Sequence, residues 1–119
     1  MKTVLICGGR DYTDKARMRE ILKSYSMPVE FRIIHGGARG ADTLAAELAV
    51  ELGIPAKAYP ADWRKHGKAA GPIRNQLMLD DGKPDIVMAF PGGKGTADML
   101  RRANHAGIMT INVLDREST

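Results

Sequence analysis

Three glycine-rich segments with basic residues contain the residues of this chain whose types and spacing best suit chemistry. They read Gly8-Gly9-Arg10-Asp11, His35-Gly36-Gly37-Ala38-Arg39-Gly40-Ala41-Asp42 and Pro91-Gly92-Gly93-Lys94-Gly95-Thr96. Because glycine carries no side chain, its backbone amide can approach an anion closely, and a helix that begins next adds unpaired N–H groups and partial positive charge. We therefore predict a phosphate-binding site. The alternative is that these glycines only make tight turns.

The spacing within these segments argues against two common nucleotide motifs. Gly95 separates Lys94 from Thr96, so the third segment lacks the Gly-Lys-Thr ending of a P-loop. The first segment lacks the third glycine of a dinucleotide fingerprint, and no acidic residue ends the next apolar run to hold a ribose. The sequence thus argues against Mg-ATP hydrolysis and against NAD binding through that fingerprint.

A basic stretch around the single tryptophan of the chain, Trp63, is a further candidate for ligand contact. Trp63 could stack on a base, and Lys68 and Arg74 could contact phosphates. We predict an irregular, flexible lid over about 60–71. The alternative is a tryptophan that packs over the edge of a sheet beside a solvated basic loop.

The histidines and the cysteine do not suggest a metal. His35 ends an apolar run beside the predicted site, where a histidine held by the backbone is the alternative to a catalytic one. His66 and His105 lie elsewhere, and no paired acidic ligand spacing accompanies them. Cys7 is the only cysteine, so an internal disulfide and a thiolate cluster are excluded. We expect no metal and no cofactor.

Short apolar runs and helical periodicity predict the elements that must position these segments. The expected strands are Thr3–Cys7, Phe31–Ile34, Pro55–Tyr59, Asp85–Phe90 and Met109–Leu114. The expected helices are about 15–26, 40–52, 72–81 and 96–106, with carboxyl-terminal stops at Gly53, Gly82 and Gly107. The leucines assigned to the core are Leu44, Leu48, Leu77 and Leu100.

This alternation predicts an α/β fold, a Rossmann-like three-layer open sheet of about five parallel strands with helices on both faces. One domain over residues 1–119 is expected from the length of the chain. In such sheets a ligand binds beyond the carboxyl ends of the strands, where the strand order reverses. Because each glycine-rich segment follows an expected strand, we expect all three to meet at that edge.

The composition of the chain narrows the classes of binding partner that it suits. The formal charge of +4 favours anionic ligands, but the charge is spread along the chain. Few aromatic residues are available to stack on successive bases, so nucleic acid is the less favoured partner. No apolar run approaches the roughly 20 residues of a membrane span, and no signal segment begins the chain. We expect a cytoplasmic protein without membrane contact.

The three segments, together with Gly71-Pro72-Ile73-Arg74-Asn75, resemble the SLOG superfamily, specifically its YspA-like (DUF2493) branch, over nearly the whole chain. Relatives include the LOG phosphoribohydrolases, the DNA-processing protein DprA and domains proposed to sense or process nucleotide-derived signals. The resemblance implies a Rossmann-like fold that binds nucleotides or nucleotide sugars. It also implies a homodimer or a higher homo-oligomer, formed through helices beside the site.

The catalytic motif of the LOG relatives carries over only in part. Their Pro-Gly-Gly-x-Gly-Thr-x-x-Glu motif and an upstream arginine, which Arg74 matches, cleave an N-glycosidic bond. Met99 stands in place of the glutamate, and the nearest carboxylate, Asp98, is one residue earlier. One residue along a helix rotates a side chain by about 100°, so Asp98 can miss the LOG position. Asp11 and Asp42 are further candidates, but Asp42 and Asp98 also suit a first helical turn, where a carboxylate offsets the dipole.

Two hypotheses and a weaker third follow. The chain is a binding module for an ADP-ribose-like or cyclic nucleotide signal, as sensor or sponge, or it is an N-glycoside hydrolase that uses Arg74 and Asp98. The third is single-stranded nucleic-acid binding, by analogy with DprA. Thr96 is expected to bind phosphate or to cap its helix. The residues assigned to a nucleotide-type ligand are Gly8, Gly9, Arg10, Asp11, His35, Gly36, Gly37, Arg39, Asp42, Trp63, Lys68, Arg74, Asn75, Pro91, Gly92, Gly93, Gly95 and Thr96.

Overall fold

One sheet of five parallel strands organises the computed structural model, which describes residues 1–26 and 30–113. The strands are β1 (Lys2–Cys7), β2 (Phe31–His35), β3 (Ala56–Ala58), β4 (Ile86–Ala89) and β5 (Met109–Asn112). Their order is β3-β2-β1-β4-β5, so the chain builds outward on one side of β1 and then crosses to the other side. The predicted Rossmann-like open sheet is confirmed.

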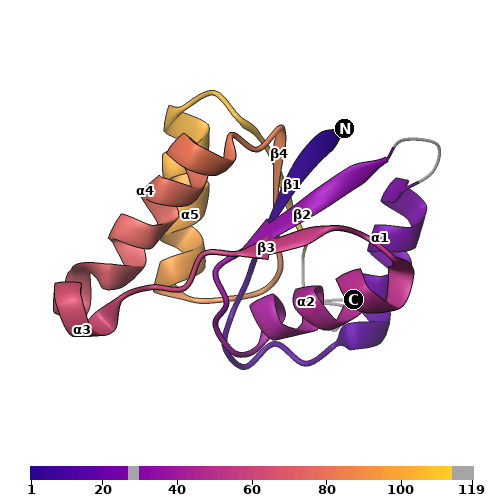
Figure 1. Cartoon of the computed structure of the whole chain (residues 1–119), viewed down its shortest axis with the longest axis horizontal. Coiled ribbons are helices and arrows are strands. Elements are labelled where there is room, and N and C mark those ends of the chain that lie inside the picture. Colours follow the sequence, from indigo (N-terminus) through magenta and orange to yellow (C-terminus); the bar gives the residue numbers. More distant parts are fainter. Residues whose placement is uncertain (27–29, 114–119) are drawn as a thin grey trace.

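Helices cover both faces of this sheet (Figure 1). They are α1 (Lys15–Ser26), α2 (Ala41–Leu52), α3 (Trp63–His66), the 3₁₀ turn η1 (Gly67–Ala69), α4 (Ala70–Gly82) and α5 (Lys94–His105). Helices α1 and α2 pack on one face, and α4 and α5 pack on the other. None of the helices in the described residues combines the length and the apolar character needed to cross a bilayer.

Alternate side chains of the central strands β1, β2 and β4 enter two separate cores. On β1, Val4 and Ile6 pack with the residues of α1 and α2, whereas Leu5 and Cys7 pack with those of α4 and α5. Because both faces are covered, the central strands are almost uninterrupted apolar runs, as is typical of parallel sheets. This explains why the strands could be located from the sequence.

The three glycine-rich segments meet where the strand order reverses. The Gly9 N–H donates to the carbonyl of Pro91 at 2.9 Å, which joins the loop after β1 to the loop after β4. The Ala41 N–H donates to the Gly9 carbonyl at 3.1 Å, which brings in the loop after β2. The expected convergence of the segments at one edge of the sheet is confirmed.

The prediction of an irregular lid over 60–71 is wrong, because α3, η1 and the start of α4 occupy most of this stretch. Asp62 begins the helical part: its carboxylate accepts a hydrogen bond from the Lys65 N–H at 3.1 Å, the usual role of an aspartate before a helix. Pro72 does not interrupt α4, because a proline in the first turn costs no helical hydrogen bond. Trp63 is therefore carried by a short helix.

Helix α5 begins two residues earlier than predicted, which changes the roles of two residues. Gly93 occupies the position before the helix, so Thr96 is the third helical residue and not the cap. Asp98 lies beyond the first turn, and its expected interaction with the helix start is wrong. Asp42 does lie in the first turn of α2, as predicted.

Three smaller expectations also change. Leu77 is 51% exposed and not in the core, because Met78 and Leu79 form the inner face of α4. Lys83, with a φ of 46°, ends α4, whereas Gly82 lies inside the helix, where a Cβ atom would overlap Ile34. The last strand ends at Asn112, and the predicted strand residue Leu114 lies outside the described residues.

Candidate functional site

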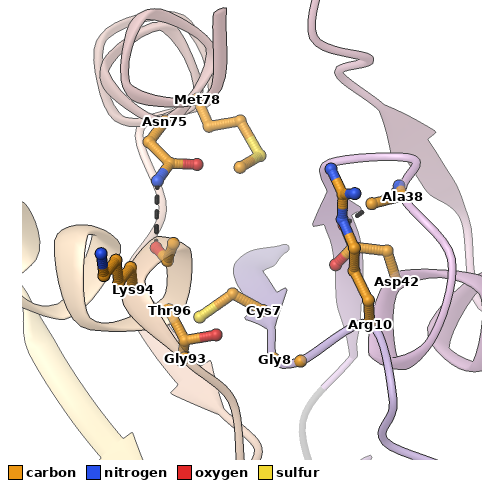
Figure 2. Close-up of a pocket in the computed structure, with 12 residues that line it drawn as sticks. Cys7, Gly8, Arg10, Ala38, Asp42, Asn75, Met78, Gly93, Lys94 and Thr96 are labelled. Atoms are coloured by element: carbon orange, nitrogen blue, oxygen red, sulfur yellow. Dashed lines mark hydrogen bonds between the residues drawn. The ribbon is translucent and has the colours of Figure 1, made fainter. Parts of the chain in front are cut away.

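A cavity of about 290 Å³ lies at the point where the strand order reverses, and four segments of the chain line it. The end of β1 forms its floor, the start of α5 and one face of α4 form one side, and the start of α2 forms the opposite side (Figure 2). The lining residues are Cys7, Gly8, Gly9, Arg10, Ala38, Asp42, Asn75, Met78, Gly93, Lys94, Gly95 and Thr96.

The amino terminus of α5 presents open backbone to this cavity. No side chain of the described residues caps the helix at Gly93, and the first N–H groups of a helix have no partner within it. A Cβ atom added at Gly93 or Gly95 would meet no atom within 4 Å. Packing therefore does not require these two glycines, and the space over the helix start is free for a ligand.

Gly92 shows the contrasting case within the same loop. A Cβ atom there would overlap the Thr96 Oγ1 atom and would lie 2.6 Å from the Gly9 nitrogen. This glycine is needed so that the loops after β1 and β4 can approach each other closely. The glycines of this loop therefore serve two different purposes. Gly92 lets two loops pack together, whereas Gly93 and Gly95 leave space open at the cavity.

Asp42 is the acidic side chain in the wall of the cavity. It is 7% exposed, and its Oδ2 atom accepts a hydrogen bond from the Ala38 N–H at 3.2 Å. Burial raises the pKa of Asp42, although the backbone N–H of Ala38 and the charge of Arg74 act in the opposite direction. The carboxyl group therefore takes up a proton more readily than an exposed aspartate does.

Arg74 supports the loop after β2 from behind the cavity. Its Nη1 atom donates to the Gly36 carbonyl at 2.7 Å and to the Tyr59 carbonyl at 3.4 Å, and its Nε atom donates to Asn75 Oδ1 at 3.0 Å. Arg74 is not among the residues that line the cavity. The contacts indicate that it holds the loop that carries Asp42.

Asp98 lies outside the cavity lining and is held by three side chains of α4 and α5. Its carboxylate accepts hydrogen bonds from Asn75 Nδ2 at 3.0 Å, Arg101 Nη2 at 2.6 Å and Arg102 Nε at 2.8 Å. Burial acts to raise the pKa of Asp98, but the hydrogen bonds from Arg102 and Asn75 outweigh it and hold the pKa below its usual value. Asp98 is therefore a stably ionised carboxylate that fixes Asn75.

Asn75 in turn connects this network to the loop between β4 and α5. Its Nδ2 atom donates to the Gly95 carbonyl at 3.3 Å as well as to Asp98, and its Oδ1 atom accepts from Arg74. These contacts use the full donor capacity of the amide group. Asn75 lines the cavity, but its polar atoms position other groups.

His35 and Cys7 are buried, and neither side chain is in a reactive state at neutral pH. The His35 Nδ1 atom accepts a hydrogen bond from the Gly37 N–H at 3.1 Å, and burial, with the charge of Arg74, lowers the pKa of His35. The imidazole is thus neutral and held by the backbone. Burial raises the pKa of the Cys7 thiol to about 12, so Cys7 is protonated and a poor nucleophile at neutral pH.

Arg10 and Trp63 lie together beside the cavity. The Arg10 guanidinium is 5.7 Å from the centroid of the Trp63 ring, and Trp63 is 50% exposed. Because Arg10 also lines the cavity, this cation–π pair extends the site toward α3. The exposed Arg39 forms an ion pair with Asp11 at 3.8 Å instead of lining the cavity.

The structure places the predicted site residues in two groups. Those that line the cavity are Gly8, Gly9, Arg10, Asp42, Asn75, Gly93, Gly95 and Thr96. Those outside its lining are Asp11, His35, Gly36, Gly37, Arg39, Trp63, Lys68, Arg74, Pro91, Gly92 and Asp98. The residues assigned from the sequence did not include Cys7, Ala38, Met78 and Lys94, which also line the cavity. Lys94 lies inside the third glycine-rich segment, and Met78 lies three residues after Asn75 on one helical face, and these positions are signals that indicate them.

Comparison with known proteins identifies the family. The sequence model described as "YspA, cpYpsA-related SLOG family" matches residues 2–66, just over half of the chain. The chain belongs to this SLOG family. The Gene 61 protein of Mycobacterium phage D29 is 37% identical to it over 125 residues, which cover 98% of this chain and 99% of the phage protein. The predicted SLOG resemblance is confirmed.

Solved structures share the fold of this SLOG chain at low identity. The structural genomics target TM1055 has a TM-score of 0.71 and 19% identity, over 92% of this chain and 72% of the other. MurG of Acinetobacter baumannii has a TM-score of 0.61 and 15% identity, over 94% and 34%. The UDP-GlcNAc 2-epimerase of Methanocaldococcus jannaschii, solved with UDP-GlcNAc and UDP, has a TM-score of 0.58 and 20% identity, over 95% and 32%.

The described part of the chain contains no cluster of side chains that could bind a metal ion. No three side chains of histidine, cysteine, aspartate or glutamate gather there closely enough to hold an ion. The groups that remain for a ligand are backbone amides, two cations, one buried carboxyl group and a stacking surface.

Proposed function

We propose that this SLOG chain binds a phosphorylated nucleotide or a nucleotide-derived signalling ligand in the cavity at the strand-order reversal. The observation that carries the proposal is the uncapped start of α5, with free space over Gly93 and Gly95. Free backbone N–H groups and the positive end of a helix together favour a phosphate. Lys94, which also lines the cavity, adds a full positive charge.

The rest of the cavity suits the remainder of a nucleotide. Arg10 and the half-exposed Trp63 offer a guanidinium plane and an aromatic face, and both can stack on a base. The epimerase of the same fold was solved with UDP-GlcNAc and UDP, which supports a nucleotide-type ligand. In open parallel sheets a ligand binds where the strand order reverses, which is where this cavity lies. An ADP-ribose-like or cyclic nucleotide signal is the class that we propose.

A sensor or sponge fits the site better than a hydrolase that depends on Asp98. Two arginines and Asn75 already hold the Asp98 carboxylate, which does not line the cavity. A carboxylate with a lowered pKa is also a poor proton donor at neutral pH. A role in holding Asn75 and the start of α5 accounts for these contacts.

Cleavage of an N-glycosidic bond is the second candidate, and Asp42 is the observation that favours it. Its carboxyl group faces the cavity, and burial raises its pKa toward the range in which a group can both accept and donate a proton. In that reaction Asp42 would accept a proton from the attacking water, and the base would leave with the bonding electron pair. Asp42 therefore replaces Asp98 as the catalytic candidate.

The experiment incubates the purified protein with adenine and guanine nucleotides, ADP-ribose and cyclic ADP-ribose isomers, and identifies retained ligands and products by mass spectrometry. Recovery of an intact ligand is expected from a sensor or sponge. A free base with a ribose phosphate would establish the hydrolase instead. Absence of any retained or converted nucleotide would overturn both.

A charge-matched pair of variants locates the ligand within the chain. Lys94→Ala removes a cation from the cavity, and Lys2→Ala removes one from the amino end of β1, at the opposite edge of the sheet. We expect Lys94→Ala to weaken the binding of the retained nucleotide by about 10-fold, and Lys2→Ala to leave it unchanged. Equal effects of the two variants would contradict binding at the start of α5.

A further inference from the structure

Resting on the proposed function, we propose that Asp42 binds a hydroxyl group of the sugar, so that the site selects ribonucleotides over deoxyribonucleotides. The inference follows from the chemistry of the groups that line the cavity. The start of α5 receives the phosphate, and Arg10 with Trp63 receives the base. The sugar lies between phosphate and base in any nucleotide, and Asp42 is the acidic group of the wall that remains for it.

The placement of Asp42 supports this assignment. It lies in the first turn of α2, across the cavity from Asn75, Lys94 and Thr96 (Figure 2). The residue is 93% buried by the remaining structure, yet it contributes to the cavity lining. A group in this position meets the middle of a ligand whose phosphate sits on α5.

The hydrogen-bond partners of Asp42 leave room for a ligand. A carboxylate has about four acceptor sites, and the backbone N–H groups of Ala38 and Gly36 occupy two of them. The ion pairs among the described residues do not include Asp42. A buried carboxylate with unused acceptor sites is costly for the fold, and a donor on the ligand would satisfy it.

The donor that suits Asp42 is a hydroxyl group. An ionised carboxylate only accepts hydrogen bonds and repels a phosphate, so the anionic part of the ligand is excluded from this side. A ribose carries two neighbouring O–H donors, and a carboxylate has two oxygens that can accept from them. The 2′-hydroxyl is also the group that distinguishes RNA-type from DNA-type nucleotides.

The test measures the affinities of ADP-ribose and its cyclic isomers, of the 5′-monophosphates of adenosine, guanosine, cytidine and uridine, and of the 2′-deoxy and 3′-deoxy analogues of each, by isothermal titration calorimetry. The wild-type protein should bind its preferred ribonucleotide about 10- to 100-fold more tightly than at least one deoxy analogue, because a hydrogen bond to a charged group is lost. In Asp42→Asn, which keeps the size of the side chain, the ribonucleotide and its deoxy analogue should bind within about 3-fold of each other.

The control is Glu30→Gln, an equal loss of a carboxylate at an exposed residue before β2, which should keep the wild-type preference. Equal affinity of the wild-type protein for ribonucleotides and deoxy analogues would overturn the assignment of Asp42 and leave the proposed function intact. A preference for the ribonucleotide that persists in Asp42→Asn would also overturn the assignment of Asp42 and leave the proposed function intact. If neither ADP-ribose and its cyclic isomers nor any of the ribonucleotides bind, the proposed function itself fails. The wild-type comparison needs no variant, so it decides even if Asp42→Asn does not fold.

Discussion

Two aspartates of similar sequence setting have opposite environments in this protein. Asp42 is buried at the cavity wall with backbone donors, and burial raises its pKa. Asp98 is surrounded by Arg101, Arg102 and Asn75, and its pKa is lowered despite burial. Each pKa shift links a protonation state to the free energy of unfolding. Replacing the two aspartates by asparagine should therefore change the free energy of unfolding in opposite directions.

Asp42→Asn should stabilise the protein at neutral pH. A raised folded-state pKa means that ionisation of Asp42 opposes folding. The contribution of the protonated carboxyl group to the free energy of unfolding is therefore complete below the unfolded-state pKa of about 3.9, and it is lost as pH rises through the folded-state pKa. We expect the variant to gain about 0.5–2 kcal/mol at pH 7 and no gain near pH 3.5. Urea unfolding at both pH values measures this, and a loss of stability at pH 7 would count against it.

Asp98→Asn should have the opposite effect. A lowered folded-state pKa means that the ionised carboxylate stabilises the fold at neutral pH, and this stability is lost as pH falls through the folded pKa. We expect the variant to lose about 1–3 kcal/mol at pH 7, because two hydrogen bonds from arginines lose their charged acceptor. The exposed Glu30→Gln is the control for urea unfolding and should change stability by less than about 0.5 kcal/mol. Unchanged stability with loss of nucleotide turnover would return Asp98 to a catalytic role.

At the scale of elements, the loop between β4 and α5 contains glycines with two separate purposes. Gly92 allows the loops after β1 and β4 to touch, whereas Gly93 and Gly95 leave open space at the helix start. The short helix α3 adds a second element to the site, since it holds Trp63 against Arg10. Strand ends, a helix start and a short helix together shape the proposed ligand site.

A matched pair of glycine substitutions separates folding from binding. Gly95→Ala lies in the helix and meets no atom, so we expect stability to be unchanged or up to about 1 kcal/mol higher. Its methyl group occupies space assigned to the phosphate, so nucleotide affinity should fall by about 10-fold or more. Gly92→Ala should lose about 1–3 kcal/mol, because its Cβ atom overlaps Thr96 and crowds Gly9.

Urea unfolding and calorimetric titration with the preferred nucleotide give both readouts for each variant. Normal affinity in Gly95→Ala would exclude a phosphate from the start of α5. Normal stability in Gly92→Ala would show that the two loops do not need their close contact.

At the scale of the whole molecule, helix α4 leaves an apolar stripe uncovered. Ile73 and Leu77 are 44% and 51% exposed and lie one turn apart, in a groove that also contains Asp80 and Arg102. A two-fold axis places each surface against itself, so these opposite charges can pair between two copies. We propose that a second copy of the chain covers this groove, which accords with the expected homo-oligomer.

Leu77→Glu should therefore shift the protein toward the monomer. The substitution places a charge on the apolar stripe without disturbing the core, because Leu77 faces away from it. Sedimentation equilibrium over a range of concentrations should show at least a 10-fold weaker association than in the wild type. Val50→Glu, an equal change at an exposed residue of α2, is the control. A wild-type protein that is monomeric at all concentrations would reject this interface.

The sequence by itself determined the five strands, the four long helices and the edge of the sheet where the glycine-rich segments converge, but not the short helix α3. Apolar runs of β1 and β4 are local signals, since both faces of a parallel strand are buried, and glycines after each run mark the turns. The right-handed connection rule then leaves few arrangements for alternating strands and helices. The meeting of Gly9 with Pro91 and with Ala41 was predictable for this reason.

Only the tertiary structure decided which side chains face the cavity. A shift of the α5 start by two residues moved Asp98 from the first turn into a cluster with Arg101 and Arg102, and no local pattern reports such a shift. The exposure of Leu77 likewise depends on which face of α4 meets α5. Helix phase and packing partners are set by contacts between segments far apart in sequence, and these contacts left Asp42 as the carboxyl group in the wall.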